Sequence, residues 1–192
     1  MNYYDVLEIF PQVKKFRNKV IEKIDGRKIL DLCTGTGAIA LLIAKKFPES
    51  QIYGLDISRH MLRKAGKKAG NLANILFIEA DAQKIPFESD SLDVIIVSFG
   101  LHEMPGEMRS RALAEIARVL KRDGRIVLID YEKPKNFLAR YLLYLFLRIF
   151  EPKHALALLD EQLEDTAKTF GISAVEESHS FIRLIYGKKV SA

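Results

Sequence analysis

The chain has 192 residues, of which 48% are hydrophobic and 29% charged, and its formal net charge is +5. This length favours one domain with a full hydrophobic core, and the composition excludes a disordered or low-complexity chain. Cys33 is the only cysteine, which excludes an internal disulfide and predicts a reducing, cytoplasmic location, and the first residues lack the basic and apolar runs of a signal peptide.

The predicted elements alternate between helices and short apolar strands. A first helix is predicted over Gln12–Ile24, and later ones over Ile39–Phe47, after the N-cap candidate Ser58, and over the segment of Leu113, Ile116 and Leu120, which Gly124 would close. The predicted strands are Lys28–Leu32, Ile52–Leu55, Ile75–Ala80, Leu92–Ser98 and Arg125–Ile129. This alternation predicts a doubly wound α/β fold with a mostly parallel sheet.

The regular alternation breaks after Tyr131. One amphipathic helix is predicted over His154–Phe170, and two strands follow at Ile172–Glu177 and Phe181–Tyr186. The turn between these strands is too short for a crossover helix, so we expect them to be antiparallel neighbours.

The segment Phe137–Phe150, FLARYLLYLFLRIF, is apolar but contains Arg140 and Arg148. As a helix it would be about 21 Å long, which is shorter than the roughly 30 Å hydrocarbon core of a bilayer. It therefore cannot comfortably span a membrane. Three interpretations stay open: a buried core helix, a lid over an apolar pocket, or a helix in a membrane interface.

The segment ILDLCTGTGAIA runs from a predicted strand through Gly35, Thr36 and Gly37 into a helix. Glycines there allow a tight turn and let a ligand lie against bare backbone beside the unpaired amides of the helix. The motif alone fits NAD as well as S-adenosylmethionine. Asp31 favours the second, because a carboxylate suits a cationic ligand better than a pyrophosphate. The alternative is that Asp31 only braces the turn.

Two more carboxylates follow strands in the same way. Asp56 ends the second strand, where it can accept hydrogen bonds from both ribose hydroxyls while Ile57 packs on an adenine ring. Asp81 ends the third strand, where it can accept from the adenine amino group while the Ala82 amide pairs a ring nitrogen. Because the carboxyl ends of parallel strands meet at one sheet edge, these groups are expected to converge with Asp31.

These motifs carry a resemblance. The chain resembles class I S-adenosylmethionine-dependent methyltransferases, close to the ubiquinone/menaquinone C-methyltransferase subgroup. The matching motifs are ILDLCTGTG, GLDIS, EADAQKIPFESDSLDVIIVSFGLHEM and the segment Ile116–Arg125. The resemblance covers Lys28–Tyr131 well and the rest loosely. It implies a Rossmann-like, mostly parallel, seven-stranded sheet with a C-terminal antiparallel hairpin. The chain would be a single domain over 1–192, with an N-terminal helical cap at 1–27 and a helical acceptor-side segment at 132–171.

The resemblance also implies site residues. The methionine part of the cofactor would lie at Asp31 and the glycine turn, the ribose at Asp56, and the sulfonium above Ser98, with Tyr3 or Tyr4 closing over the cofactor. The full set of cofactor-binding candidates is Asp31, Gly35, Thr36, Gly37, Asp56, Ile57, Asp81, Ala82 and Ser98. A metal site is not expected. Methyl transfer needs a general base only where the acceptor must lose a proton, and the candidates near the methyl group are His102, Glu103 and Tyr131.

The predicted function is methyl transfer from S-adenosylmethionine to a small, apolar or lipid-like acceptor, a quinone precursor or a phospholipid. The aromatic and leucine residues of Phe137–Phe150 favour such an acceptor, and this segment is also where a peripheral membrane contact is expected. A nucleic-acid partner is disfavoured because the lysines are scattered. Two alternatives are an NAD-dependent oxidoreductase, although Tyr131 lacks a Tyr-x-x-x-Lys spacing, and a non-catalytic methyltransferase-like subunit.

Overall fold

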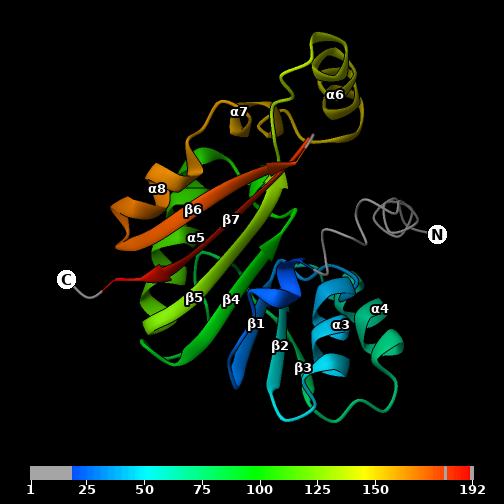
Figure 1. The fold of residues 1–192 in the computed structure, drawn as a ribbon. Coiled ribbons are helices and arrows are strands. Elements are labelled where there is room, and N and C mark those ends of the chain that lie inside the picture. The colour runs from blue at the N-terminus through cyan, green and yellow to red at the C-terminus, as the bar shows by residue number, and fades with distance from the viewer. Residues whose placement is uncertain (1–18, 180, 191–192) are drawn as a thin grey trace.

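The computed structural model describes residues 19–179 and 181–190 (Figure 1). Tyr3, Tyr4 and most of the predicted helix Gln12–Ile24 lie outside the described residues. Of that helix, residues 19–22 are helical, and Val20, Ile21 and Ile24 are buried against one face of the sheet.

Seven strands of the described residues form one sheet with the order β3-β2-β1-β4-β5-β7-β6. Their bounds are β1 Lys28–Leu32, β2 Gln51–Asp56, β3 Ile75–Glu79, β4 Leu92–Ser98, β5 Leu120–Tyr131, β6 Ile172–His179 and β7 Ile182–Lys189. Strands β1 to β5 pair in parallel, and β7 is antiparallel to both β5 and β6. The mostly parallel α/β sheet with its antiparallel C-terminal hairpin is thereby confirmed.

Both faces of the sheet are covered by helices. Helix α3 (Ala38–Lys46) packs with residues 20–24 on one face, beside α4 (Arg59–Ala69), while α5 (Gly106–Val119), α7 (Ala155–Leu158) and α8 (Leu163–Thr169) contribute to the core on the other face. Successive residues of β4 serve the two cores in turn: Ile95 and Val97 face α5, and Val94 and Ile96 face α3. This explains why β4 reads as a continuous apolar run rather than an alternating one.

The prediction of one helix over His154–Phe170 is wrong, because residues 159–162 separate α7 from α8. The break has a polar cause. The carbonyls of Leu158 and Glu161 accept hydrogen bonds from the buried guanidinium of Arg183, at 2.6 and 2.8 Å. The Glu161 carboxylate pairs with Arg109 of α5. A continuous helix would have turned these groups elsewhere.

The prediction that Gly124 closes the helix before β5 is also wrong. Helix α5 ends at Val119, and Leu120 already belongs to β5, where it pairs with Leu92 of β4 and is fully buried. Burial of Leu120 in the sheet therefore overrides its place in the helical pattern. Gly124 lies inside the strand, at the register shift between β4 and β5.

Helix α6 (Phe137–Phe150) follows β5 and projects from the carboxyl end of the sheet (Figure 1). Its N-cap is Asn136, whose side-chain oxygen accepts a hydrogen bond from the Ala139 amide at 3.0 Å. Of its own residues only Leu143 and Leu147 are buried, so α6 is not a core helix. Within the described ranges, no helix has the length and apolar character needed to cross a membrane.

Candidate functional site

The turn between β1 and α3 is left-handed at three positions. Cys33, Gly35 and Gly37 have φ angles of 59°, 54° and 79°. A Cβ atom built on Gly35 would meet nothing within 4 Å, so the backbone there is bare and faces open space. Helix α3 begins at this turn with Gly37 as its N-cap residue. The turn thus places an open stretch of backbone beside the amino end of a helix, which suits an anionic group such as a carboxylate.

Asp31 lies beneath this turn at the end of β1 and is buried. Its Oδ2 accepts hydrogen bonds from Thr34 Oγ1 at 2.6 Å and from the Ala40 amide at 3.1 Å. The bracing role that the sequence left as an alternative is therefore observed. The carboxylate fixes the turn to the first residues of α3.

Asp56 ends β2 and connects the β1 and β2 loops. Its two oxygens accept from the Gly35 and Ser58 amides, each at 2.8 Å. The next residue, Ile57, keeps 70% of its surface exposed, which is unusual for an isoleucine beside a buried strand. A carboxylate and an apolar side chain are thus presented together next to the glycine turn.

Asp81 follows β3 and accepts hydrogen bonds from the amide of Gln83 at 2.8 Å and from its side chain at 3.1 Å. The loop is tied to β2, because the Ala80 amide donates to the Asp56 carbonyl at 3.1 Å. The Ala82 side chain is buried in the core beneath. The structure therefore brings the Asp31, Asp56 and Asp81 segments to one sheet edge, as the strand ends predicted. Ser98 ends β4 at the same edge.

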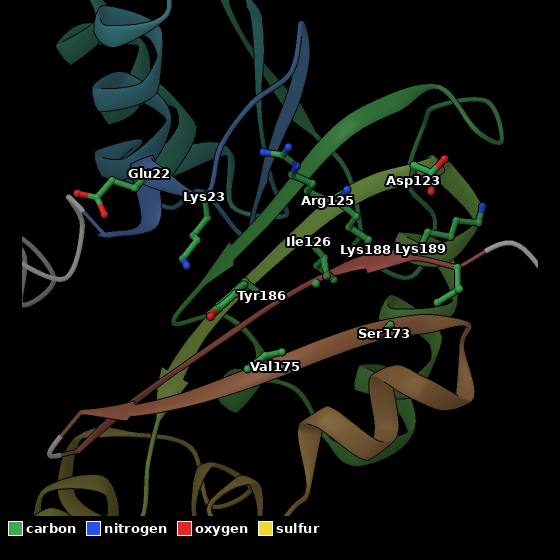
Figure 2. A pocket seen from close by; sticks show the side chains of 12 residues that line it. Glu22, Lys23, Asp123, Arg125, Ile126, Ser173, Val175, Tyr186, Lys188 and Lys189 are labelled. Carbon is green, nitrogen blue, oxygen red and sulfur yellow. The ribbon is translucent and has the colours of Figure 1, made fainter.

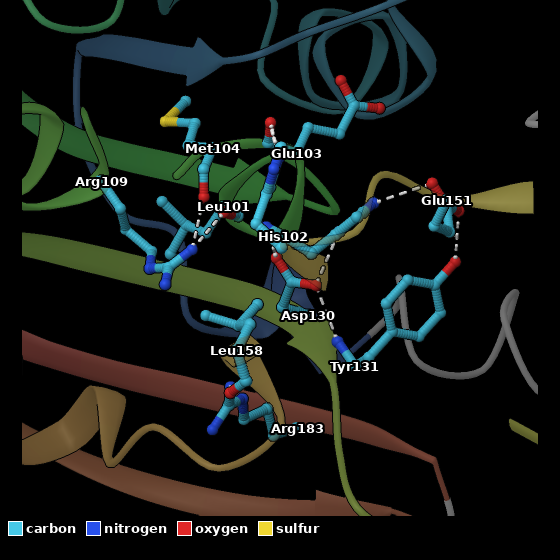
Figure 3. Close-up of polar contacts among 11 residues, drawn as sticks. Leu101, His102, Glu103, Met104, Arg109, Asp130, Tyr131, Glu151, Leu158 and Arg183 are labelled. Carbon is cyan, nitrogen blue, oxygen red and sulfur yellow. Dashed lines mark hydrogen bonds and ion pairs between the residues drawn. The ribbon is translucent and has the colours of Figure 1, made fainter. Parts of the chain in front are cut away.

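A second group of polar residues lies at the carboxyl ends of β4 and β5 (Figure 3). His102, in the short helix η1 (Leu101–Glu103), is fully buried. Its Nδ1 lies 2.8 Å from Asp130 Oδ1, and its Nε2 lies 3.4 Å from Glu151 Oε2. Burial opposes a charge on the ring, but the Asp130 and Glu151 carboxylates outweigh it and raise the pKa of His102 to about 10.

Tyr131 joins this group from the end of β5. Its hydroxyl donates to Glu151 Oε1 at 3.1 Å, and its amide donates to Asp130 Oδ1 at 2.8 Å. Its ring packs 4.8 Å from the His102 ring, centre to centre. His102 and Tyr131 are thus brought together, through two carboxylates that sequence analysis missed. Glu151 had one sequence signal: it is the acid that directly follows the apolar segment Phe137–Phe150.

Glu103 is exposed, and its carboxylate approaches the same group. Donor atoms of His102, Glu103 and Glu151 all lie within 4.8 Å of one another, a spacing that can suit a metal ion. The raised pKa of His102 favours a protonated ring, so a metal ion would have to displace that proton in order to bind. In this arrangement the three residues form an ion-pair cluster.

Arg109 of α5 holds the loop that carries His102. Its buried guanidinium donates to the carbonyls of Leu101 and Met104, at 3.1 and 2.6 Å (Figure 3). It also pairs with the Glu161 carboxylate. Sequence analysis missed this residue too. The available signal was that Arg109 shares the apolar face of α5 with Ala112, Leu113 and Ile116.

A separate hollow of about 540 Å³ lies where β5, β6 and β7 face Lys23 (Figure 2). It is lined by residues of the first half of β5, including Arg125 and Ile126, and by Tyr186 and Lys188 of β7. These residues lie at the opposite end of β5 from Tyr131. The hollow is therefore remote from the carboxylates of the sheet edge.

Comparison with known proteins gives a consistent result. The model of the ubiE/COQ5 methyltransferase family matches residues 1–167. The chain is 40% identical to a demethylmenaquinone methyltransferase of Thermotoga maritima over 139 residues, which are 69% of this chain and 58% of that protein. It is 33% identical to the Bacillus licheniformis enzyme of the same name over 147 residues, 74% of this chain and 62% of that protein.

Among solved structures, a SAM-dependent methyltransferase from Aquifex aeolicus superimposes with a TM-score of 0.73 at 21% identity, covering 96% of this chain and 92% of that one. This likeness confirms the fold. The chain spans about three fifths of the length of the curated relatives it matches, at 58% and 62%.

Proposed function

Because this chain belongs to the ubiE/COQ5 methyltransferase family, we propose that it transfers a methyl group from S-adenosylmethionine to an apolar acceptor of the quinone-precursor kind. The observation that supports the proposal is the arrangement of residues at the carboxyl ends of β1, β2 and β3. Three carboxylate segments meet there around a bare glycine turn. Family membership argues against an NAD-dependent oxidoreductase.

The residues present fit the cofactor. The open space at Gly35 beside the amino end of α3 suits the methionine carboxylate, and the half-buried Asp56 suits the ribose hydroxyls. The exposed Ile57 would cover one face of the adenine, which Asp81 and the Ala82 amide would contact at its edge. When bound, S-adenosylmethionine supplies an electrophilic methyl group on a sulfonium. Of the remaining members of the predicted set, Thr36 and Gly37 belong to the same turn, and Ser98 ends β4 at the same edge of the sheet.

On the acceptor side, the structure favours a positioning role for His102. A protonated ring between two carboxylates cannot accept a proton, so His102 is poorly suited to act as a general base at neutral pH. It would instead hold Glu151 and Tyr131 in place. Glu103, which is exposed beside them, is the carboxylate better placed to take a proton from an acceptor hydroxyl.

The acceptor class rests on two supports. The relatives named above are demethylmenaquinone methyltransferases, and the segment after β5 is rich in apolar side chains. A phospholipid is the second candidate acceptor, favoured by the exposed face of α6. Either acceptor is dissolved in membranes, so we propose a membrane-peripheral location.

The first experiment is calorimetric titration with S-adenosylmethionine, S-adenosylhomocysteine and NAD. We expect micromolar binding of the first two and none of NAD. The second is transfer of a labelled methyl group to a demethylated naphthoquinol or to phospholipid in detergent, with the quinol as the expected acceptor. Folded protein that binds NAD alone would revive the oxidoreductase, and binding of S-adenosylmethionine without turnover of either acceptor would favour a non-catalytic subunit.

A further inference from the structure

Helix α6 presents apolar side chains on the side that faces away from the protein. Its two buried residues, Leu143 and Leu147, lie one turn apart and pack near Tyr131 and Leu159. The opposite side carries a stripe with helical spacing whose members are 44% to 63% exposed: Leu138, Tyr141, Leu142, Leu145 and Ile149. A helix that is apolar all round is normally covered all round, so this outward stripe indicates a binding surface.

The charges around the stripe are mostly positive and favour an anionic partner. Helix α6 contains two arginines and no acid, and the flanking stretches add three lysines. These five cations are Lys133, Lys135, Arg140, Arg148 and Lys153. Between 133 and 153 the one acid is Glu151, whose side chain is buried against His102 and Tyr131. Asp160 pairs with Lys133 and so offsets the charge of this lysine, but not the charges of the other four cations.

An anionic surface would complement these cations, whereas a second copy packed stripe to stripe would bring like charges together. Interfacial helices lie flat, with their apolar face at the boundary of headgroups and acyl chains and their cations near anionic lipids. In Figure 1, α6 stands clear of the sheet at one end of the protein, where a flat surface can reach it.

We propose that α6 binds an anionic lipid surface, with Leu138, Leu142 and Leu145 inserted among acyl chains and Arg148 and Lys153 at the headgroups. This binding deepens the membrane-peripheral location proposed above, but it does not require methyl transfer. One consequence does depend on it: the helix ends at Glu151, which contacts His102, so an acceptor dissolved in the lipid would lie beside the acceptor side of the site.

The test is co-sedimentation with vesicles of phosphatidylcholine and phosphatidylglycerol, compared with phosphatidylcholine alone. We expect binding to the anionic vesicles and weak or no binding to the neutral ones. Substituting Leu142→Glu and Leu145→Glu together should weaken the binding about tenfold or more, because two apolar insertions are lost. Val190→Glu is the matched control: Val190 is 53% exposed, but it follows the end of β7, which pairs with the first half of β5, whereas α6 follows the other end of β5.

Fluorescence locates the contact, since the chain has no tryptophan. The indole of Leu142→Trp should shift its emission to the blue on anionic vesicles, while that of Val190→Trp should not. Absence of vesicle binding, or equal binding by the glutamate variant, would overturn the proposal. So would a dimer in sedimentation velocity that the glutamate variant dissolves, because a second copy would then cover the stripe. None of these measurements requires the cofactor, so failure of methyl transfer would be recognised separately.

Discussion

The cofactor side and the acceptor side of the site are built in different ways. On the cofactor side, residues 31–83, the carboxylates accept hydrogen bonds mainly from nearby amides and hydroxyls: Asp31 from Thr34, Asp56 from Ser58, and Asp81 from Gln83. On the acceptor side, His102 and Asp130, both buried, pair across 28 residues, and the buried Arg109 pairs across 52 residues with the partly exposed Glu161.

This difference has an energetic consequence. A carboxylate that accepts from local backbone amides keeps its partners whenever the local turn forms. A buried ion pair keeps its partner only when distant segments have packed, and loss of one member leaves an uncompensated charge in the core. The acceptor side is therefore expected to respond more strongly to substitution and to pH, and four predictions test this, in order of expected size.

The largest effect is expected for Arg109→Ala, which leaves two carbonyls and the Glu161 carboxylate without their cation. The Arg109 side chain is buried but that of Glu161 is 36% exposed, so most of the cost comes from the two carbonyls, at about 1–3 kcal/mol each, and should total about 3–5 kcal/mol of unfolding free energy. Urea unfolding followed by circular dichroism measures the change. Arg111→Ala is the control on the same helix, because its pair with Glu107 is exposed and should contribute nothing measurable. Equal losses for both variants would contradict the buried-charge account.

Sequence analysis predicted the cofactor side better than the acceptor side, because local contacts follow from sequence patterns and contacts between distant segments do not. The strands β1 to β4 and the turn at Gly35 follow from local patterns, and so do the positions of Asp31, Asp56 and Asp81. Arg109 and Glu161 could not be paired in advance, because their contact depends on a helix break at 159–162 that only tertiary packing explains. Asp130 directly follows the predicted strand Arg125–Ile129, and nothing local indicated that it faces His102.

The second prediction concerns the pH dependence of stability. The folded pKa of His102, about 10, exceeds its unfolded value of about 6.5. The protonated ring therefore contributes its full stability below about pH 6.5, and this contribution is lost as the pH rises towards 10. The loss between these limits should amount to several kcal/mol of unfolding free energy.

His102→Gln removes the titrating group, so its unfolding free energy should fall less over the same pH range than that of the wild type. The exposed His60 provides the control, because His60→Gln should leave the wild-type profile unchanged. Parallel profiles for the wild type and His102→Gln would show that the ring is not a buried cation.

On the cofactor side, Asp56→Ala should weaken S-adenosylhomocysteine binding about 100-fold, equivalent to about 2.7 kcal/mol, if the carboxylate holds the ribose. The fold should be largely retained, because Asp56 is only half-buried and loses two bonds, to the amides of Ser58 in its own loop and Gly35 in the neighbouring turn. Calorimetry and thermal melting separate the two effects. Glu79→Ala is the control. Glu79 lies opposite Asp56 on the neighbouring strand β3, and its exposed carboxylate pairs with Arg59, so its loss should leave binding unchanged. Unchanged binding by Asp56→Ala would remove Asp56 from the cofactor site.

The smallest effect tests whether the acceptor side is one network or a set of separate pairs. Tyr131→Phe deletes only the hydroxyl that donates to Glu151, and Glu151→Gln removes the charge that this hydroxyl shares with His102. If the residues act together, a double-mutant cycle of unfolding free energies should give a coupling of about 1 kcal/mol. A cycle between Tyr131→Phe and Arg111→Ala should give none, since those residues share no partner. A coupling near zero in the first cycle would mean that α6 is held to β5 by Leu143 and Leu147 alone, and that the hydroxyl of Tyr131 serves some purpose other than fixing Glu151.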